Sequence, residues 1–414
     1  MTLDMFFESG KDERDLSYCE PLYYIPQLSD ELNPTRRQVM DWTDEQLNEY
    51  LIKLQKYLVD LFEKDNISFF GSTMDRARII KTLQALDELN TINNKDIFED
   101  GFITGFQHFE LAINHWFPEM VSIDVNSAIS ILDAVKDFIK LKKKFYRTVV
   151  ENRLKNYKSD LNTVFPPFKY AFKVASGNQT VTNIRCTVAK WIYQNVPKDP
   201  GEFIVWDPSM GWAGRLASFL AAARQSSASQ NVYIGTDPNT KIKDRYLMIK
   251  DFWSNWIRPL NNTEVYPLCC GSEVAHEQEI FQKYIGKGNL VYTSPPYFDK
   301  EHYSDETTQS YLKFPVYEQW RDGFLRPTIQ NASMFLKPGG YMYWNIADIK
   351  RGSVWYTLED DSKKFAEEFG LEYKYILYMR MGANRFPGAP NSKNLIMHKG
   401  NYVKFEPVFV FQKR

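Results

Sequence analysis

The sequence predicts an α/β protein that carries an all-α domain at its N-terminal end. Two observations indicate this division: after an irregular start, residues 1–160 contain three amphipathic helical patterns, whereas short apolar runs alternate with helical patterns through residues 161–414. Glycine, proline or acidic residues also follow several of the apolar runs, as expected where strands end. A chain of 414 residues is long enough for two such domains.

The composition predicts a folded protein but does not identify a partner. Hydrophobic residues make up 43% of the chain, which allows a substantial core. The net charge of −1 means that a nucleic-acid site would need basic residues gathered in one patch. The four cysteines form neither a disulfide framework nor a zinc pattern, so we expect no metal. Without a signal peptide or an apolar run of ~18 residues, we expect a cytoplasmic protein with no membrane span.

Helical spacing of apolar residues predicts three helices in the first domain. The first begins at Thr43 and continues to residue 62, and the second covers residues 75–89. The third covers residues 126–152 and ends in a basic cluster that includes Lys142, Lys143, Lys144 and Arg147. A solvated helix end explains some of these cations through the helix dipole, and contact with a phosphate backbone is the other interpretation. The domain therefore serves nucleic-acid positioning or subunit contact, and the sequence does not choose between them.

The second domain begins with a helix over residues 182–194 and a buried strand over residues 202–206. The segment that follows, residues 207–214, is named here the glycine turn. Gly211 and Gly214 permit a tight turn and close backbone approach before a helix over residues 216–223. Such a turn is also common at ordinary strand–helix junctions.

An acidic residue follows the second strand of this domain. The strand covers residues 231–235, and Asp237 comes directly after it. A carboxylate at this place, roughly 20–30 residues beyond a glycine turn, can accept hydrogen bonds from both ribose hydroxyls of an adenosine. A nicotinamide dinucleotide would use the same acid, so Asp237 alone does not identify the cofactor.

The most informative segment is the proline turn, Ser294, Pro295, Pro296 and Tyr297, which follows a predicted strand over residues 290–292. Two prolines end the strand and stiffen the backbone, so that carbonyl groups point outward at the carboxyl end of a strand. A hydroxyl, free carbonyls and an aromatic ring suit a flat ring that bears an amino group. A nucleobase swung out of its duplex has these properties.

The proline turn resembles the catalytic motif of the DNA methyltransferases that modify exocyclic amino groups (cytosine N4 or adenine N6), over about residues 165–414. The glycine turn resembles the cofactor loop of that family, with Ala213 where a glycine is common. The run Lys337, Pro338, Gly339 and Gly340 before an apolar strand is widespread among S-adenosylmethionine methyltransferases.

The resemblance implies a Rossmann-like catalytic domain that binds S-adenosyl-L-methionine. Asp207 would face the amino-acid end of this cofactor, and Gly211 would lie against it. Ser272 or Glu273, after a third strand over residues 265–268, would meet its adenine. The remaining cofactor positions taken from the motif are Pro208 and Gly214.

The resemblance also implies methyl transfer to the amino group of a flipped base in double-stranded DNA, as in restriction-modification systems. The form of the motif with Thr293 before Ser294 is typical of enzymes acting on cytosine N4. Ser294 and the Pro295 carbonyl would hold the two amino hydrogens, and Tyr297 would stack on the base. Neighbouring Cys269 and Cys270 are expected to be packed rather than reactive.

Three alternatives stay open at this point. The enzyme could act on adenine N6, or on RNA or a protein amide, because planar amides can use a similar turn. A non-catalytic cofactor-binding assembly module would agree with the large helical domain and with Ala213. A partner subunit or a homo-oligomer is a further possible use of the helical domain.

The rest of the chain is expected to complete the sheet. We predict a polar loop over residues 298–304, a helix over 311–330, a turn over 332–340 and a strand over 341–346. A short helix over 365–369 and two strands over 373–379 and 403–411 follow. Between the last two strands lies a polar loop in which Arg385 and Lys393 are candidate DNA contacts.

Overall fold

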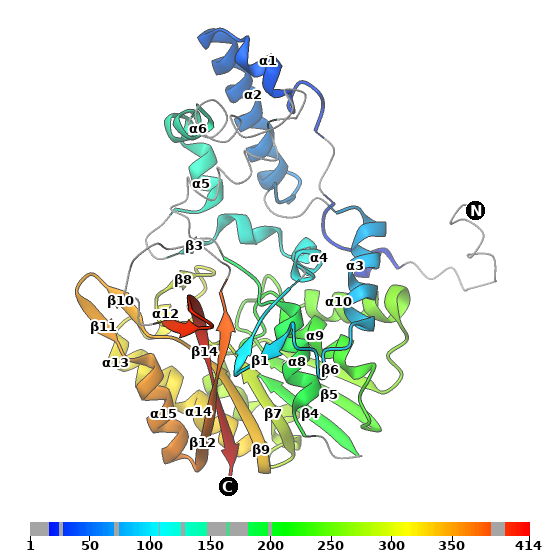
Figure 1. Cartoon of the computed structure of the whole chain (residues 1–414), viewed down its shortest axis with the longest axis vertical. Helices are drawn as coiled ribbons and strands as arrows, with labels where there is room; N and C mark the ends of the chain where they lie inside the picture. Colours follow the sequence, from blue (N-terminus) through cyan, green and yellow to red (C-terminus); the bar gives the residue numbers. More distant parts are fainter. Residues whose placement is uncertain are drawn as a thin grey trace, which may run out of the picture.

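The computed structural model describes residues 16–24, 28–69, 74–106, 108–125, 129–146, 164, 181–197, 201–381 and 394–414. A ten-stranded sheet dominates the described part of the chain (Figure 1), with the strand order β1-β2-β12-β14-β9-β7-β4-β5-β6 and β13 beside β14. The strands β6, β5, β4, β7 and β9 run parallel, whereas β14 is antiparallel to both β9 and β12. The main strands are β4 (Glu202–Asp207), β5 (Gln230–Thr236), β6 (Thr263–Leu268), β7 (Gly288–Thr293), β9 (Leu336–Asn345), β12 (Leu371–Arg380), β13 (Leu395–His398) and β14 (Asn401–Lys413).

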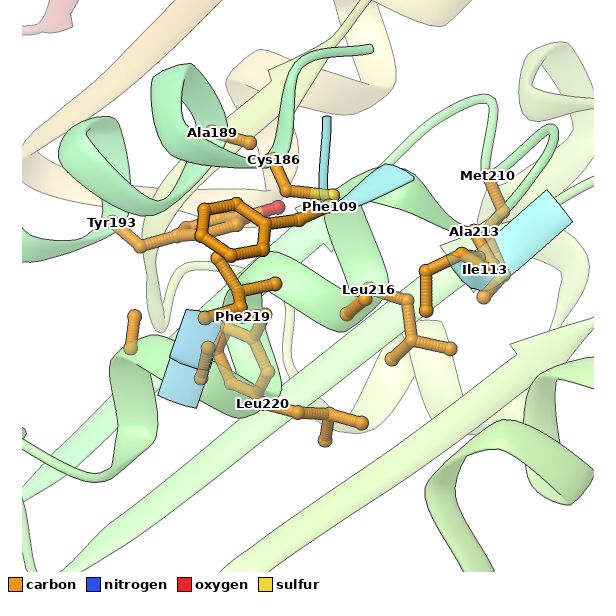
Figure 2. Close-up of a cluster of buried hydrophobic side chains, with 14 of the residues drawn as sticks. Phe109, Ile113, Cys186, Ala189, Tyr193, Met210, Ala213, Leu216, Phe219 and Leu220 are labelled. Carbon is orange, nitrogen blue, oxygen red and sulfur yellow. The ribbon is translucent and has the colours of Figure 1, made fainter. Parts of the chain in front are cut away.

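Helices cover both faces of this sheet, and the strand sequences explain why. In β4, Phe203 and Val205 face one hydrophobic core while Ile204 and Trp206 face another, so four consecutive residues of the strand are apolar. The first core contains residues of α8 (Cys186–Asn195), α9 (Gly214–Ala223) and α10 (Arg245–Phe252). The second contains residues of α11 (Glu279–Lys283), α13 (Tyr317–Trp320), α14 (Arg326–Phe335) and α15 (Leu358–Glu368). Figure 2 shows the first core, where Tyr193 of α8 and Phe219 of α9 lie beside Phe109.

The N-terminal part of the chain divides between two cores. The helix α2 (Asp44–Glu63) is capped by Thr43, which forms a capping box with Gln46. Its leucine face packs against α5 (Ile131–Lys136) and α6 (Phe138–Phe145). The helix α3 (Arg76–Glu88) instead buries Ile79 and Leu83 in the core that it shares with α8 and α9. Both helices confirm the sequence prediction. The domain boundary near residue 160 stays a prediction. Several residues between positions 74 and 125 contribute to the core of the sheet.

Short strands also occur in the N-terminal part, where the sequence predicts helices alone. They are β1 (Phe98–Glu99), β2 (Phe102–Ile103) and β3 (Asp124–Val125). Strand β2 pairs in parallel with β12 and so extends the large sheet. Such two-residue strands depend on a partner strand, which no local sequence pattern reveals.

The prediction of one continuous helix over residues 126–152 is wrong. It forms α5 (Ile131–Lys136) and α6 (Phe138–Phe145), with Asp137 between them in an extended conformation. The Asp137 side chain accepts a hydrogen bond from the Lys140 amide at 3.0 Å and caps α6. Ile139, in the first turn of α6, is 80% exposed.

The predicted helix over residues 311–330 is also divided. It forms α12 (Ser310–Lys313), then α13, a π-helical turn and α14. Helix α14 continues to Phe335, so the first residues of the turn predicted over 332–340 are helical. Strand β9 starts at once with Leu336, and the register between β7 and β9 shifts between Gly288 and Leu290. Within this irregular part of β9, Gly339 has φ +78°, a backbone conformation that glycine adopts without strain.

The remaining predicted helices differ only in their bounds. The helix predicted from residue 182 starts at Cys186, and the one predicted from residue 365 starts at Leu358. Part of the predicted loop over residues 380–400 forms β13, and Arg385 and Lys393 lie outside the described residues. None of the helices in the described ranges has the length and apolar character that a bilayer crossing requires.

A buried charge cluster fixes α3 to the sheet domain. Asp87 is 1% exposed and pairs with Arg224 at 2.8 Å and with Arg258 at 3.2 Å. Lys190 of α8 is completely buried beside it and donates to the carbonyls of Leu86 and Asp87 at 2.8 and 3.0 Å. Burial lowers the pKa of Lys190 to about 7 although Asp87 opposes this shift.

We predict that this lysine makes the protein more stable as the pH rises above about 7. Between that pH and the ordinary lysine pKa of about 10.4, the unfolded chain binds a proton that the folded chain does not. The free energy of unfolding should therefore rise with pH over this interval, and Lys190→Met should remove the rise. Urea unfolding at several pH values measures it. The control is Lys81→Met on exposed α3 surface, and an equal pH slope in all three proteins would contradict the prediction.

Candidate active site

The candidate site lies at the carboxyl ends of the central parallel strands. Strand β4 pairs with β5 on one side and with β7 on the other, and Trp206 lies opposite both Ile234 and Val291. The chain continues from β4 to β5 and β6 on one side of β4, and then to β7 and β9 on the other side. The strand order therefore reverses at β4. The glycine turn after β4, Asp237 after β5 and the proline turn after β7 therefore meet at one edge of the sheet.

The glycine turn depends on left-handed backbone at two residues. Gly211 has φ +52° and Ala213 has φ +57°, so Ala213 adopts the conformation that a glycine would adopt without strain. Gly214 begins α9, where a Cβ atom would meet the Asn183 side-chain oxygen at 2.3 Å. The Asn183 amide donates to the Trp212 carbonyl at 2.6 Å and so fixes the turn to the segment before α8. Ala213 therefore preserves the turn despite its departure from the family pattern.

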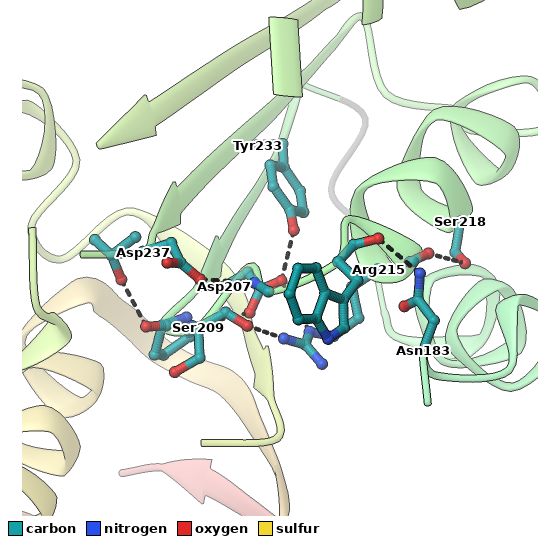
Figure 3. Close-up of polar contacts among 12 residues, drawn as sticks. Asn183, Asp207, Ser209, Arg215, Ser218, Tyr233 and Asp237 are labelled. Carbon is teal, nitrogen blue, oxygen red and sulfur yellow. Dashed lines mark hydrogen bonds and ion pairs between the residues drawn. The ribbon is translucent and has the colours of Figure 1, made fainter. Parts of the chain in front are cut away.

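Asp207 is held inside the protein by a buried network (Figure 3). Its carboxylate is 0% exposed and accepts from Arg215 Nε at 2.8 Å and from the Tyr233 hydroxyl at 2.6 Å. The Ser209 amide donates to its other oxygen at 3.2 Å. These contacts join β4, β5 and the first turn of α9. Contact of Asp207 and of Pro208 with a cofactor stays a prediction.

Asp237 is placed differently, because its residue is half-buried rather than enclosed. One carboxylate oxygen accepts from the Gly211 amide at 2.9 Å and the other from the Asn239 amide at 3.0 Å. Burial raises the pKa of Asp237 to about 6, and the two amide hydrogen bonds oppose this shift. The carboxylate thus connects the tip of β5 to the glycine turn and is ionised near neutral pH.

Ser272 and Glu273 bond to helices at the side of the site. The Ser272 hydroxyl lies 3.0 Å from the Thr328 hydroxyl of α14, and Glu273 pairs with Lys313 of α12 at 2.8 Å. Both residues are buried, so their contact with adenine stays a prediction. The expectation that both neighbouring cysteines are packed is wrong for Cys269, which is exposed at the end of β6. Burial raises the pKa of the Cys270 thiol to about 12, which makes that thiol unreactive.

The proline turn places Ser294 half-buried and Tyr297 almost completely buried, at 8% exposure. The Tyr297 hydroxyl donates to Glu406 Oε1 at 2.5 Å, and the Asn345 carbonyl lies 3.2 Å away. The Ser294 hydroxyl donates to the Tyr297 oxygen at 3.4 Å. Lys300 places its ammonium group 4.7 Å from the centre of the Tyr297 ring. In this conformation the ring is not open for stacking, and that predicted role stays a prediction.

Sequence reasoning did not identify Glu406 or Lys300 as parts of the site. Glu406 interrupts an otherwise apolar stretch of β14, which is the signal that could have indicated it. Its position opposite the proline turn depends on pairing between β14 and β9, which joins distant segments. Among the described residues, no group of three or more histidine, cysteine or acidic side chains could hold a metal ion.

The loop after the proline turn crosses the carboxyl edge toward β5. Its strand β8 (Glu301–His302) pairs with β3 of the N-terminal part. Glu306 accepts from the Thr240 amide at 3.1 Å and from its hydroxyl at 2.7 Å. The ring of Tyr303 lies 6.1 Å from that of Trp212 in the glycine turn. The loop therefore bridges the proline turn and the glycine turn.

The predicted basic cluster lies on α6, in the group of helices beyond β3 (Figure 1). Lys143 is exposed, whereas Lys142 and Lys144 are half-buried. Arg147 lies outside the described residues, as do Arg385 and Lys393. The described lysines are therefore not part of the sheet edge, and their DNA contacts stay a prediction.

No family model and no curated protein matches the chain. A TehB-like S-adenosylmethionine-dependent methyltransferase from Corynebacterium glutamicum is 15% identical over 59% of this chain and 95% of its own, with a TM-score of 0.32. A proposed class I methyltransferase from Listeria monocytogenes is 11% identical over 89% of this chain and 88% of its own, with a TM-score of 0.38. A proposed DNA modification methylase from Thermus thermophilus is 20% identical over 34% of this chain and 50% of its own, with a TM-score of 0.23.

With TM-scores below 0.5, these structures carry no argument about the activity or substrate of this chain. The sheet itself confirms the predicted α/β, Rossmann-like fold, because β6, β5, β4, β7 and β9 run parallel and helices cover both of their faces.

We predict that Glu306→Ala loosens the loop after the proline turn. The variant loses two hydrogen bonds from Thr240 to a charged acceptor, and such bonds contribute about 1 kcal/mol or more. Amide hydrogen exchange over residues 298–309 should become about fivefold faster or more. Glu318→Ala on exposed surface of α13 is the control. Unchanged exchange in Glu306→Ala would show that the bridge does not restrain the loop.

Proposed function

We propose that the protein transfers a methyl group from S-adenosyl-L-methionine to the exocyclic amino group of a flipped base in double-stranded DNA, with cytosine N4 as the target. One observation carries this proposal: the proline turn ends β7 directly beside β4, so that it shares the reversal point of the sheet with the glycine turn and Asp237. Under this proposal Asp237 accepts from an adenosine and Ser294 from an amino group, at the ends of the two strands that flank β4.

The residues at the end of β5 fit the proposed cofactor. Asp237 is ionised near neutral pH, partly exposed, and held by the Gly211 amide, so its carboxylate can accept the ribose hydroxyls. Gly211 lets the backbone approach the bound molecule closely. When bound, S-adenosylmethionine supplies a methyl group on a positively charged sulfur.

The proline turn fits the proposed base. An exocyclic amino group is a weak nucleophile because its lone pair is delocalised into the ring. Ser294 and the carbonyl of Pro295 would accept its two hydrogens and favour the geometry in which the lone pair is free. The nitrogen would then bond to the methyl carbon while the carbon–sulfur bond breaks, so that S-adenosylhomocysteine leaves as a neutral thioether and the nitrogen loses one proton to solvent. No covalent bond to the protein forms.

The lysines of α6 support a nucleic acid as the substrate. Lys142, Lys143 and Lys144 form a short basic run, which suits phosphate contact. The group of helices that carries them adjoins β3, which pairs with the loop after the proline turn. We therefore propose that this part of the chain positions duplex DNA over the site. A restriction-modification setting and a partner subunit belong to the same proposal.

Adenine N6 methylation is the second candidate, since the contacts named above recognise an amino group and not a particular ring. The test is incubation with tritiated S-adenosylmethionine and unmodified duplex DNA, followed by nucleoside analysis. Detection of N4-methylcytosine supports the proposal. Detection of N6-methyladenine instead would show that the target is adenine N6. Label in parallel RNA or protein samples alone, or cofactor binding with no transfer at all, contradicts it.

We predict that Ser294→Ala lowers methyl transfer to DNA by about 10²–10³-fold, because it removes one preorganised acceptor for the amino group. Cofactor affinity, measured by calorimetry, should stay within twofold of the wild type. Ser333→Ala is a matched control, since Ser333 is buried at 5% exposure and bonds to the Phe369 carbonyl away from the site. Full activity of Ser294→Ala would remove Ser294 from the proposed mechanism.

A further prediction concerns the pH dependence of cofactor binding. The ionised form of Asp237 accepts the ribose hydroxyls, so affinity should be complete above the pKa of about 6 and should fall as the pH drops below it. We expect a loss of about tenfold between pH 7.5 and pH 5 in calorimetric titrations. Asp237→Asn should bind weakly and without this pH dependence. The exposed Asp244 supplies the control variant Asp244→Asn, and a flat profile for the wild type would exclude the role of Asp237.

A further inference from the structure

We infer that Tyr297 and Glu406 are positioning residues for Ser294, and that Tyr297 acts through its hydroxyl rather than by stacking on the base. This inference rests on the proposed function and assigns a role to Glu406, which the motif does not contain. It also explains why a tyrosine in the proline turn is directed into the protein.

The surroundings of the Tyr297 ring oppose a stacking role. The residue is 8% exposed and belongs to the same hydrophobic core as Phe298, Trp320 and Trp344. Its hydroxyl end is fixed by Glu406 at 2.5 Å, and Lys300 lies 4.7 Å from the ring centre. Stacking of a base on the ring face beside Lys300 would require this cation to move.

The hydrogen-bond directions around the Tyr297 hydroxyl follow from its single proton. Glu406 Oε1 at 2.5 Å and the Asn345 carbonyl at 3.2 Å are both acceptors, so the tyrosine must use its proton on that side. Burial, with Glu406 adding to the effect, raises the pKa of Tyr297 far above its usual value, so the phenol keeps this proton. The tyrosine oxygen is then available to accept the proton of Ser294 at 3.4 Å.

The consequence for Ser294 is chemical. Once its own proton is directed toward Tyr297, both lone pairs of its oxygen are free to accept hydrogen bonds from a substrate. The proline beside it offers a carbonyl and no amide hydrogen. The Ser294 oxygen and the Pro295 carbonyl thus offer acceptors side by side, which suits a substrate with amino hydrogens.

Strand pairing holds this arrangement in place. Glu406 precedes Pro407 in β14. The Pro407 carbonyl accepts a hydrogen bond from the Asn345 side-chain amide at 2.9 Å. Asn345 ends β9 and lies opposite Val408 of β14. A hydrogen bond to a carboxylate is roughly twice as strong as one between neutral groups, so Glu406 fixes the tyrosine more firmly than the Asn345 carbonyl alone.

The decisive variant is Tyr297→Phe, which keeps the aromatic ring and removes the hydroxyl. We expect kcat for DNA methylation to fall about tenfold or more while KM for DNA and cofactor affinity change less than twofold. Tyr317→Phe is a matched control, because Tyr317 is also 8% exposed and its hydroxyl donates to Asp361 at 2.6 Å. The two variants should lose similar thermal stability, and only Tyr297→Phe should lose kcat.

Glu406 is tested by a graded pair of variants. Glu406→Gln keeps an oxygen acceptor and should retain more kcat than Glu406→Ala, whereas Asp361→Asn should leave kcat unchanged. A purely structural role would lower stability in all of them without separating kcat from KM. If Glu406→Ala does not fold, Tyr297→Phe and Glu406→Gln still decide the question.

The outcomes separate the two proposals. Wild-type kcat in Tyr297→Phe, together with an inactive Tyr297→Ala, would establish stacking and overturn the positioning role while leaving the proposed function intact. A wild-type protein that transfers no methyl group to DNA, RNA or protein would overturn the proposed function and with it this inference. A selective loss of kcat in Tyr297→Phe supports both.

Discussion

The structure depends on the parallel pairing of β4 with both β5 and β7. Because the chain leaves β4 toward β5 first and returns on its other side as β7, the loops after β4 and β7 start side by side at the carboxyl edge. The buried contacts of Asp207 with Arg215 and Tyr233 hold the first loop in shape at this point. Everything proposed about function assumes that these two loops stay neighbours.

At the carboxyl edge of the sheet, Asp237 and Ser294 share one property: each offers a hydrogen-bond acceptor. Asp237 presents a carboxylate that burial does not keep protonated at neutral pH, and Ser294 presents an oxygen whose proton is directed to Tyr297. The loop after the proline turn connects the two through the contact of Glu306 with Thr240. Its pairing with β3 also links the N-terminal part of the chain to the site, so that a molecule held by that part could reach the proline turn.

The central strands could be predicted well because both of their faces are buried, which leaves continuous apolar runs such as that of β4. The helices α2 and α3 were equally clear from their apolar faces. Prediction failed where one residue competes with a longer pattern, as when Asp137 caps α6 and interrupts a helix. The site residues Ser294 and Asp237 were recognisable from their places after strands, whereas Glu406 was not, because its role depends on which strand lies beside β9.

The sequence by itself determined the order of the main strands of the sheet, the positions of the glycine and proline turns, and the acidic residue after β5. Each of these follows from local patterns: apolar periodicity, backbone restriction by proline, and the freedom of glycine. Only the tertiary structure decided that Tyr297 points into the core toward Glu406, and that residues 74–125 share the core of the sheet. Such contacts join segments far apart in the chain, and the energy that selects them comes from packing and hydrogen bonding that exist only once the fold has formed.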